Sequence, residues 1–274
     1  MGKERIDVML VEQGFFDSRE KAKAAIMAGI VFHGSERLEK PGTKIDHTFE
    51  LSVKGHIHPY VSRGGLKLEK ALHYFEIDMS NRTMLDIGAS TGGFTDCALQ
   101  QGATLVYAID VGYNQLDYKI RQDSRVVVME RTNFRYVEPK DLIGPTPNFA
   151  SIDVSFISLK LILPVLKTLL DQSGDVVALI KPQFEAGREE IGKSGVIRDP
   201  KVHQRVLEDM LHFAAEVGFE LQGLTYSPIR GGEGNIEFLA HWTIMETGST
   251  FDHIESFTKL VEQTVKEAHQ STSK

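Results

Sequence analysis

Residues 86–95 have the composition of a loop that binds a nucleotide-like cofactor. The stretch Asp-Ile-Gly-Ala-Ser-Thr-Gly-Gly-Phe-Thr follows a short apolar strand and opens a helix. Small residues let the backbone turn tightly and approach a ligand, and open α/β sheets bind ligands beyond the carboxyl ends of their strands. Asp110 ends the next predicted strand, 22 residues after Gly88, near the offset typical of an acid that binds a ribose. The spacing therefore favours a bound cofactor over a simple glycine-rich turn.

The residue types indicate S-adenosylmethionine rather than NAD. A dinucleotide fingerprint would have glycine where this chain has Ser90. Asp86 would repel a pyrophosphate but attract the cationic methionine end of S-adenosylmethionine. Thr132 and Asn133, just past the third predicted strand, either lie near the adenine or form only a polar turn. The candidate cofactor-binding residues are Asp86, Gly88, Ser90, Thr91, Gly92, Gly93, Phe94, Asp110, Thr132, Asn133 and Asp153.

Two lysines and two acids form the candidate catalytic set. Asp153 ends the fourth predicted strand and Lys181 ends the fifth. Lys67 lies just before the sheet begins, and Glu237 lies at the start of the last strand. Each alone is readily explained as an exposed charge, but two acids and two lysines near one face of a sheet favour a shared site at the cofactor side.

Strands and helices that alternate from residue 83 onward must position these side chains. Strands are predicted at 84–87, 105–109, 126–129, 149–152 and 176–180, and helices at 66–74, 95–101 and 159–170. This alternation is typical of a doubly wound, Rossmann-like α/β domain with a mostly parallel sheet. Two further strands, 221–226 and 236–245, predict an antiparallel end to the sheet, and 251–269 predicts a last helix.

Residues 1–59 are predicted to form a separate, small α+β domain. A connector over about 54–61 joins it to a domain at 60–274. The small domain would begin with a short helix that ends near Gly14. A second helix, with Asp17 and Glu20 as a capping box, would end at Gly29, and strands follow at 30–32 and 49–53.

Five motifs give the chain a specific resemblance. They span 62–68, 86–95, 153–158, 181–185 and 234–238. On these motifs the chain resembles the hemolysin A/TlyA family of ribosomal RNA 2'-O-methyltransferases, whose catalytic domain resembles FtsJ-type ribose methyltransferases. The resemblance implies a class I methyltransferase sheet, S-adenosylmethionine as cofactor, and methylation of a ribose, that of a cytidine, in ribosomal RNA.

The N-terminal residues resemble an S-four-like RNA-binding domain. The matching positions are Ser18, Arg19, Ala22, Ile26, Gly29, Val31, Pro41 and Ile45, although Phe32-His33-Gly34 replaces a typical Val-Asn-Gly turn. Residues 1–73 carry a net charge of +2 and the rest −9, which biases any RNA contact toward the N-terminal quarter. Phosphate contacts would position RNA without reading its sequence, unless these side chains form only a solvated face. The candidates are Arg5, Arg19, Lys21, Lys23, Lys44 and Arg63.

The resemblance maps the family's Lys-Asp-Lys-Glu tetrad onto Lys67, Asp153, Lys181 and Glu237. A ribose 2'-hydroxyl is a poor nucleophile until its proton is withdrawn, and Lys181 is the candidate base. Lys67 would be the nearby cation that lowers the pKa of Lys181, while the two acids orient both ammonium groups. Lys181 as a positioner of the hydroxyl is the alternative.

Cysteine content and the lack of long apolar runs limit the classes of protein to which the chain can belong. The single cysteine, Cys97, excludes an internal disulfide and fits a cytoplasmic setting. We expect no metal site. We also expect no membrane partner, because no apolar run reaches about 18 residues and residues 1–7 do not form a signal peptide. Three alternatives to a methyltransferase are considered: a membrane-active hemolysin, a non-catalytic RNA-binding or assembly factor, and an NAD-dependent oxidoreductase.

Overall fold

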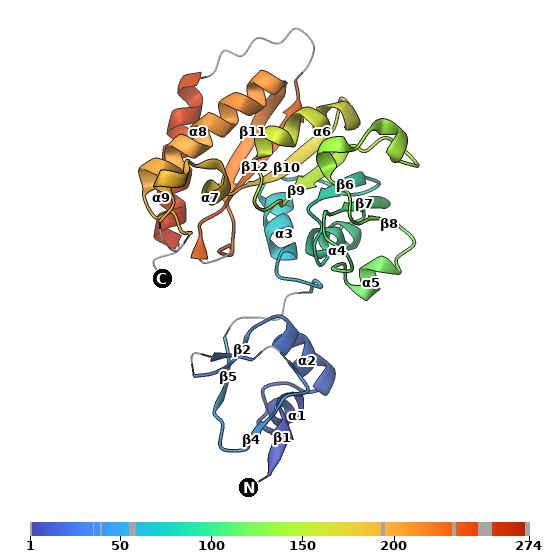
Figure 1. Ribbon diagram of the computed structural model, residues 1–274, viewed down its shortest axis with the longest axis vertical. Helices are drawn as coiled ribbons and strands as arrows, with labels where there is room; N and C mark the ends of the chain where they lie inside the picture. Colours follow the sequence, from blue (N-terminus) through green and yellow to red (C-terminus); the bar gives the residue numbers. More distant parts are fainter. Residues whose placement is uncertain are drawn as a thin grey trace. The chain divides into compact units, whose positions relative to one another are not determined.

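The chain forms two compact units, residues 1–63 and 64–274 (Figure 1). The computed structural model describes residues 2–34, 36–38, 40–54, 59–192, 195–231, 234–245 and 254–271. Half of the predicted connector, residues 55–58, lies outside the described residues. The units divide between Arg63 and Gly64, a few residues beyond the boundary expected from the sequence.

The smaller unit packs two helices with two small antiparallel sheets. Its core contains Ile6 and Leu10 from the first helix, Ile26 from the second and Val31 from a strand. The sheets pair β1 with β4 and arrange three strands in the order β3-β2-β5. The bounds are β1 (Lys3–Arg5), α1 (Ile6–Glu12), α2 (Arg19–Met27), β2 (Val31–His33), β3 (Glu36–Arg37), β4 (Lys44–Asp46) and β5 (Leu51–Val53).

The cap of α2 differs from the sequence prediction. Ser18, not Asp17, is the N-cap, and its hydroxyl accepts a hydrogen bond from the Lys21 N–H at 3.3 Å. Asp17 instead pairs with the Lys21 ammonium at 2.7 Å. The reason is that Ser18 has the extended backbone an N-cap requires, directly before the first helical residue. The helix ends as predicted, with Gly29 in the left-handed conformation just beyond it.

The larger unit contains a seven-stranded sheet in the order β11-β12-β10-β9-β6-β7-β8. The strands from β6 to β10 are parallel, and β12 is antiparallel to both β10 and β11, which confirms the predicted fold class. The bounds are β6 (Thr83–Ile87), β7 (Leu105–Ile109), β8 (Val126–Met129), β9 (Phe149–Ile152), β10 (Asp175–Ile180), β11 (Phe219–Tyr226) and β12 (Phe238–Ile244).

Side chains alternate between the two faces of this sheet. Leu85 and Ile87 belong to the large apolar core that includes residues of α6 (Leu163–Leu169) and α8 (Pro200–Val217). Asp86, between them in sequence, points to the other face, where Thr95 of α4 (Gly93–Gln100) contacts it. Helices therefore cover both faces, as Figure 1 shows. The remaining helices are α3 (Gly65–Tyr74), α5 (Tyr118–Arg121), α7 (Pro182–Glu185), α9 (Ile254–Ser271) and the short 3-10 turns η1 (Phe134–Tyr136), η2 (Pro139–Asp141), η3 (Leu159–Leu161) and η4 (Arg188–Glu190).

Two helical regions depart from the sequence prediction. The single helix expected at 159–170 is divided into η3 and α6, with Pro164 in the first turn of α6. The long α8 was not predicted, although Asp199 caps it, Pro200 begins it and Gly218 ends it. The start of the predicted last helix, 251–253, lies outside the described residues.

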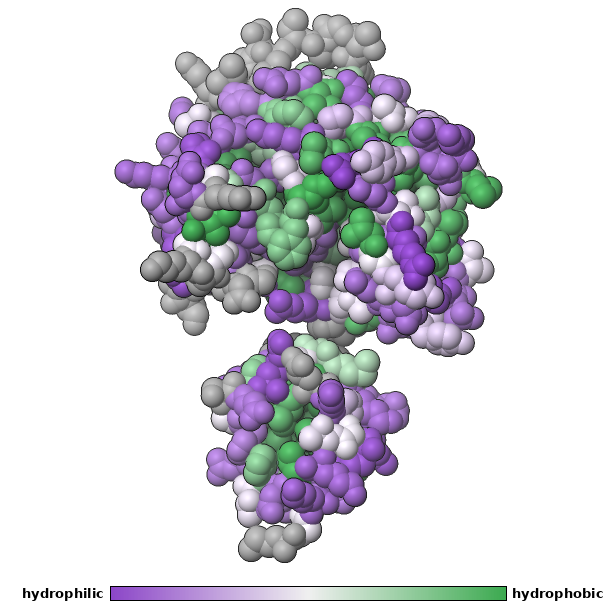
Figure 2. Space-filling model, in the orientation of Figure 1, coloured by the Kyte–Doolittle hydropathy of each residue, from purple (hydrophilic) through white to green (hydrophobic). Residues whose placement is uncertain are grey.

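Figure 2 shows hydrophilic and hydrophobic side chains mixed over the visible face of each unit. Among the described residues, each helix is too short or too polar to cross a bilayer.

The cap assignment predicts a local effect of Ser18→Ala. Loss of an N-cap hydroxyl destabilises a helix by about 1 kcal/mol, so amides of α2 should exchange about fivefold faster with solvent deuterium. Hydrogen-exchange mass spectrometry measures this directly. Asp17→Ala is the matched control, and an effect larger than that of Ser18→Ala would refute the assignment.

Candidate active site

The four predicted catalytic residues meet in one cluster of ion pairs. Lys67 Nζ lies 2.7 Å from Glu237 Oε2 and 3.3 Å from Asp153 Oδ2. Lys181 Nζ lies 2.5 Å from Asp153 Oδ1 and donates a hydrogen bond to Ser155 Oγ at 3.1 Å. Asp153 therefore stands between the two ammonium groups, and Glu237 contacts only Lys67.

Neighbouring strand ends create this cluster. Asp153 follows β9 and Lys181 follows β10, and these strands are paired in parallel, so their carboxyl ends lie at the same edge of the sheet. Glu237 immediately precedes β12, which runs antiparallel to β10 and therefore starts at that edge. Lys67 comes from the first turns of α3. A side chain at Gly231 would overlap the Glu237 carboxylate, so glycine there leaves the space that this carboxylate occupies.

Mutual attraction favours the charged forms of Lys67 and Asp153. Burial lowers the pKa of Lys67, but the carboxylates of Asp153 and Glu237 outweigh it, and the pKa lies above its ordinary value. Burial likewise raises the pKa of Asp153, but Lys67 and Lys181 outweigh it, and the pKa lies below its ordinary value. Lys67 is thus a firmly held cation.

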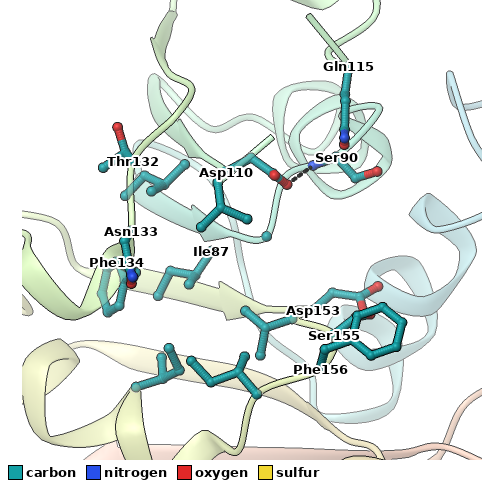
Figure 3. Close-up of a pocket in the computed structure, with 16 residues that line it drawn as sticks. Ile87, Ser90, Asp110, Gln115, Thr132, Asn133, Phe134, Asp153, Ser155 and Phe156 are labelled. Atoms are coloured by element: carbon teal, nitrogen blue, oxygen red, sulfur yellow. Dashed lines mark hydrogen bonds between the residues drawn. The ribbon is translucent and has the colours of Figure 1, made fainter. Parts of the chain in front are cut away.

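A cavity of about 340 Å³ adjoins the cluster. Figure 3 shows Asp153, Ser155 and Phe156 on one side of it and Thr132, Asn133 and Phe134 on another. Apolar walls with a few polar groups are typical of sites for small ligands, and the volume falls in their usual range. The cavity is lined by Ile87, Gly88, Ser90, Ile109, Asp110, Val111, Gln115, Thr132, Asn133, Phe134, Asp153, Val154, Ser155, Phe156, Ile157 and Ile162.

Asp110 fixes the loop around the cavity. One carboxylate oxygen accepts a hydrogen bond from the Ser90 N–H at 2.8 Å, drawn in Figure 3, and the other accepts from the Gly112 N–H at 2.7 Å. Gly88 has φ +90°, and a Cβ there would overlap the Asp153 carbonyl. The backbone thus passes directly against the end of β9, as the glycine-rich sequence suggested.

Asp86, a predicted cofactor-binding residue, is buried and is not among the residues that line the cavity. Its carboxylate is fully buried, and it accepts hydrogen bonds from Thr95 Oγ1 at 2.6 Å and Ser151 Oγ at 3.1 Å. Burial raises its pKa to about 6. In the described structure it sits in the core beneath the loop, because the alternation of β6 turns it toward α4.

The other loop residues shape the turn. Gly92 has φ +93° and begins α4, where a Cβ would press against Leu116. Gly93 and Phe94 are buried, while Thr91 is exposed and its carbonyl accepts from the Asp117 N–H. Of the predicted cofactor-binding residues, those on the cavity wall are Gly88, Ser90, Asp110, Thr132, Asn133 and Asp153.

Two residues that line the cavity were missed by the sequence analysis. Ser155 contacts Lys181, and Phe156 is 92% exposed at the cavity with φ +62°. Both follow Asp153 in the motif 153–158, so their place after a strand end was the available signal.

Ion pairs hold several of the predicted RNA-binding side chains. Asp7 is buried and binds Arg5 at 2.8 Å and Arg19 at 2.9 Å, and the hydrogen bond from Arg5 lowers the pKa of Asp7 to about 2. Both guanidinium groups remain partly exposed. Lys21 pairs with Asp17 and Lys23 with Glu20, and Lys44 and Arg63 are exposed.

Comparison with known proteins identifies the class to which this fold and site belong. Residues 60–243 match the family described as FtsJ-like methyltransferase. The chain therefore belongs to the FtsJ-like methyltransferases, which use S-adenosylmethionine, and its relatives place it in the TlyA group.

The relatives cover most of the chain. The protein YqxC of Bacillus subtilis (strain 168) is 64% identical over 87% of this chain and 85% of its own length. The 16S/23S rRNA (cytidine-2'-O)-methyltransferase TlyA of Mycobacterium tuberculosis (strain H37Rv) is 42% identical over 85% of this chain and 87% of its own. A solved structure from Streptococcus thermophilus is 54% identical and superimposes with a TM-score of 0.77 over 100% of both chains.

The buried Asp86 predicts a gain in stability for Asp86→Asn. Because the folded-state pKa is raised from 3.8 to about 6, the charged form costs stability as pH rises through this window. At pH 7 the neutral amide should raise the free energy of unfolding by about 1–3 kcal/mol. Urea unfolding at pH 7 and pH 4 measures this, and the difference should vanish at pH 4. A variant less stable than wild type at pH 7 would contradict the raised pKa of Asp86.

Proposed function

We propose that this protein transfers a methyl group from S-adenosylmethionine to the 2'-hydroxyl of a cytidine ribose in ribosomal RNA. The observation that carries the proposal is the double role of Asp153, which lines the cofactor-sized cavity and also binds both lysines. The site that would hold a methyl donor is therefore continuous with the site that would activate an acceptor. The substrate follows the TlyA relative, whose name specifies cytidine in 16S and 23S ribosomal RNA.

The cavity fits S-adenosylmethionine chemically. The apolar side chains of Ile109 and Phe134 suit an adenine ring, and Asp110 offers carboxylate oxygens to ribose hydroxyls beside Asn133. When bound, S-adenosylmethionine supplies a methyl group activated by a positively charged sulfur. The carboxylate of Asp153 provides negative charge on the same wall.

The two lysines of the tetrad have different roles in the proposed reaction. Two carboxylates hold Lys67, whereas Lys181 shares one carboxylate with Lys67 and otherwise contacts the Ser155 hydroxyl. We therefore assign Lys181, in its neutral form after its ammonium has released a proton to solvent, to accept the proton of the 2'-hydroxyl, and Lys67 to hold Asp153 and Glu237 in place as a fixed cation. The methyl carbon gains a bond to the ribose oxygen as it loses its bond to sulfur, so the residues must align one displacement and remove one proton.

We assign RNA binding to residues 1–63 as an S-four-like domain. Arg5 and Arg19 support this, because Asp7 holds both guanidinium groups side by side while leaving them partly exposed. Such contacts would position RNA through its phosphates. We further propose that the reaction takes place in the cytoplasm, since ribosomal RNA is its proposed substrate.

Removal of the Lys181 amine tests the function. We expect Lys181→Ala to lower the rate of methylation about 100-fold or more at saturating substrates, because general-base catalysis contributes about 10²–10⁴-fold. The assay measures transfer of labelled methyl to ribosomal RNA from cells that lack this gene. S-adenosylmethionine affinity, measured by calorimetry, should stay near that of wild type.

Lys140→Ala is the matched control, since Lys140 pairs with Glu138 on the surface. It should keep the wild-type rate. If Lys181→Ala binds both substrates normally and turns over at the wild-type rate, Lys181 is not the base.

A further inference from the structure

Two segments that follow neighbouring strands carry two of the four tetrad residues. Residues 153–158 follow β9 and contain Asp153, Ser155 and Phe156. Residues 181–185 follow β10 and contain Lys181 and Glu185. Neither segment is part of the sheet, so strand pairing alone does not fix the distance between their side chains.

Contacts join the two segments at both ends. At one end Lys181 binds Asp153 and Ser155. At the other end Glu185 Oε2 accepts a hydrogen bond from Ser158 Oγ at 2.5 Å, and Glu185 Oε1 accepts from the Leu159 N–H at 2.8 Å. Both carboxylate oxygens of Glu185 thus hold the end of the segment opposite to the catalytic lysine.

The part between these ends is under strain. Phe156 has φ +62°, a conformation that costs a non-glycine residue energy and persists only where neighbouring contacts enforce it. Its ring lies 5.0 Å from that of Phe184, centroid to centroid. The end contacts therefore oppose relaxation of the segment, whose Asp153 N–H also donates to the Ile87 carbonyl at 2.9 Å.

We propose that Glu185 is a positioning residue for methyl transfer, whose carboxylate fixes residues 153–158 against residues 181–185 and so holds Asp153 and Ser155 on Lys181. The inference rests on the proposed function, because it concerns the same tetrad. Glu185 touches neither lysine in the described contacts, so its effect on the reaction passes through Ser158 and the segment that precedes it.

The surroundings of Glu185 define a conservative replacement. Burial raises its pKa, against the hydrogen bonds from Ser158 and the Leu159 N–H. A neutral side chain of the same shape therefore suits the site. Glutamine keeps one accepting oxygen, and its amide can donate to the Ser158 hydroxyl, which also accepts hydrogen bonds.

The test compares Glu185→Ala and Glu185→Gln in methylation of ribosomal RNA from cells that lack this gene. We expect Glu185→Ala to lower kcat about 10–100-fold, since small misplacements of reacting groups have effects of this size, while KM for RNA stays near wild type. Glu185→Gln should recover much of the lost kcat. S-adenosylmethionine affinity is measured separately, because residues 153–157 line the cavity.

Asp171→Ala is the matched control for loss of a carboxylate. Asp171 also accepts from a serine hydroxyl and a backbone N–H, those of Ser173, but it precedes β10 at the opposite edge of the sheet. It should keep the wild-type kcat. Equal kcat for Glu185→Ala and Asp171→Ala would overturn the proposal, as would a Glu185→Gln variant no better than Glu185→Ala.

Ser158→Ala decides the question if Glu185→Ala fails to fold. It removes the hydroxyl that donates to Glu185 and that also accepts from the Lys160 N–H at 3.1 Å. A lowered kcat with unchanged KM supports the proposal, while a wild-type kcat overturns it. Lys181→Ala in the same assay distinguishes failure of the proposed function from failure of the role assigned to Glu185. A wild-type rate for Lys181→Ala refutes the proposed function itself, whereas an inactive Lys181→Ala beside a fully active Glu185→Ala refutes only the role of Glu185.

Discussion

The carboxylate of Asp153 binds one lysine ammonium through each of its oxygens, and the arrangement of the site depends on this interaction. Like charges about 4 Å apart repel by about 4 kcal/mol near a protein surface, so the two lysines could not approach each other without an anion between them. Glu237 adds a second anion on the side of Lys67. Because Asp153 also forms part of the cavity wall, the same carboxylate sets the position of the lysines relative to the cofactor site.

The sheet supplies the geometry that this interaction requires. Parallel pairing of β9 with β10 brings Asp153 and Lys181 to one edge, and the antiparallel β12 begins at that edge with Glu237 beside it. The glycine-rich loop after β6 reaches the same edge, where Gly88 lies against the Asp153 backbone. Parts of the chain far apart in sequence thus meet in a single ion-pair cluster and cavity.

The regular part of this architecture could be predicted from the sequence because buried strands and tight turns leave local patterns. The strands at 105–109, 126–129 and 149–152 were predicted with the bounds they have in the structure. Contacts between segments leave no such pattern. The burial of Asp86 under α4, the choice of Ser18 over Asp17 as a cap, and the link from Glu185 to Ser158 depend on backbone directions that spacing does not specify. The tetrad itself was grouped through strand ends, whereas its assignment to ribose chemistry came from family resemblance.

The most direct test of the account is the rate at which Asp153→Asn forms 2'-O-methylcytidine in ribosomal RNA, measured by mass spectrometry of nucleosides at saturating cofactor and RNA. Asparagine keeps the shape of the side chain but removes the charge between the lysines. We predict that the wild-type protein forms 2'-O-methylcytidine and that Asp153→Asn forms it about 100-fold more slowly or not at all, since alignment and proton removal each contribute on this scale. A wild-type rate for Asp153→Asn, or methyl groups found on the base instead of the ribose, would contradict the account.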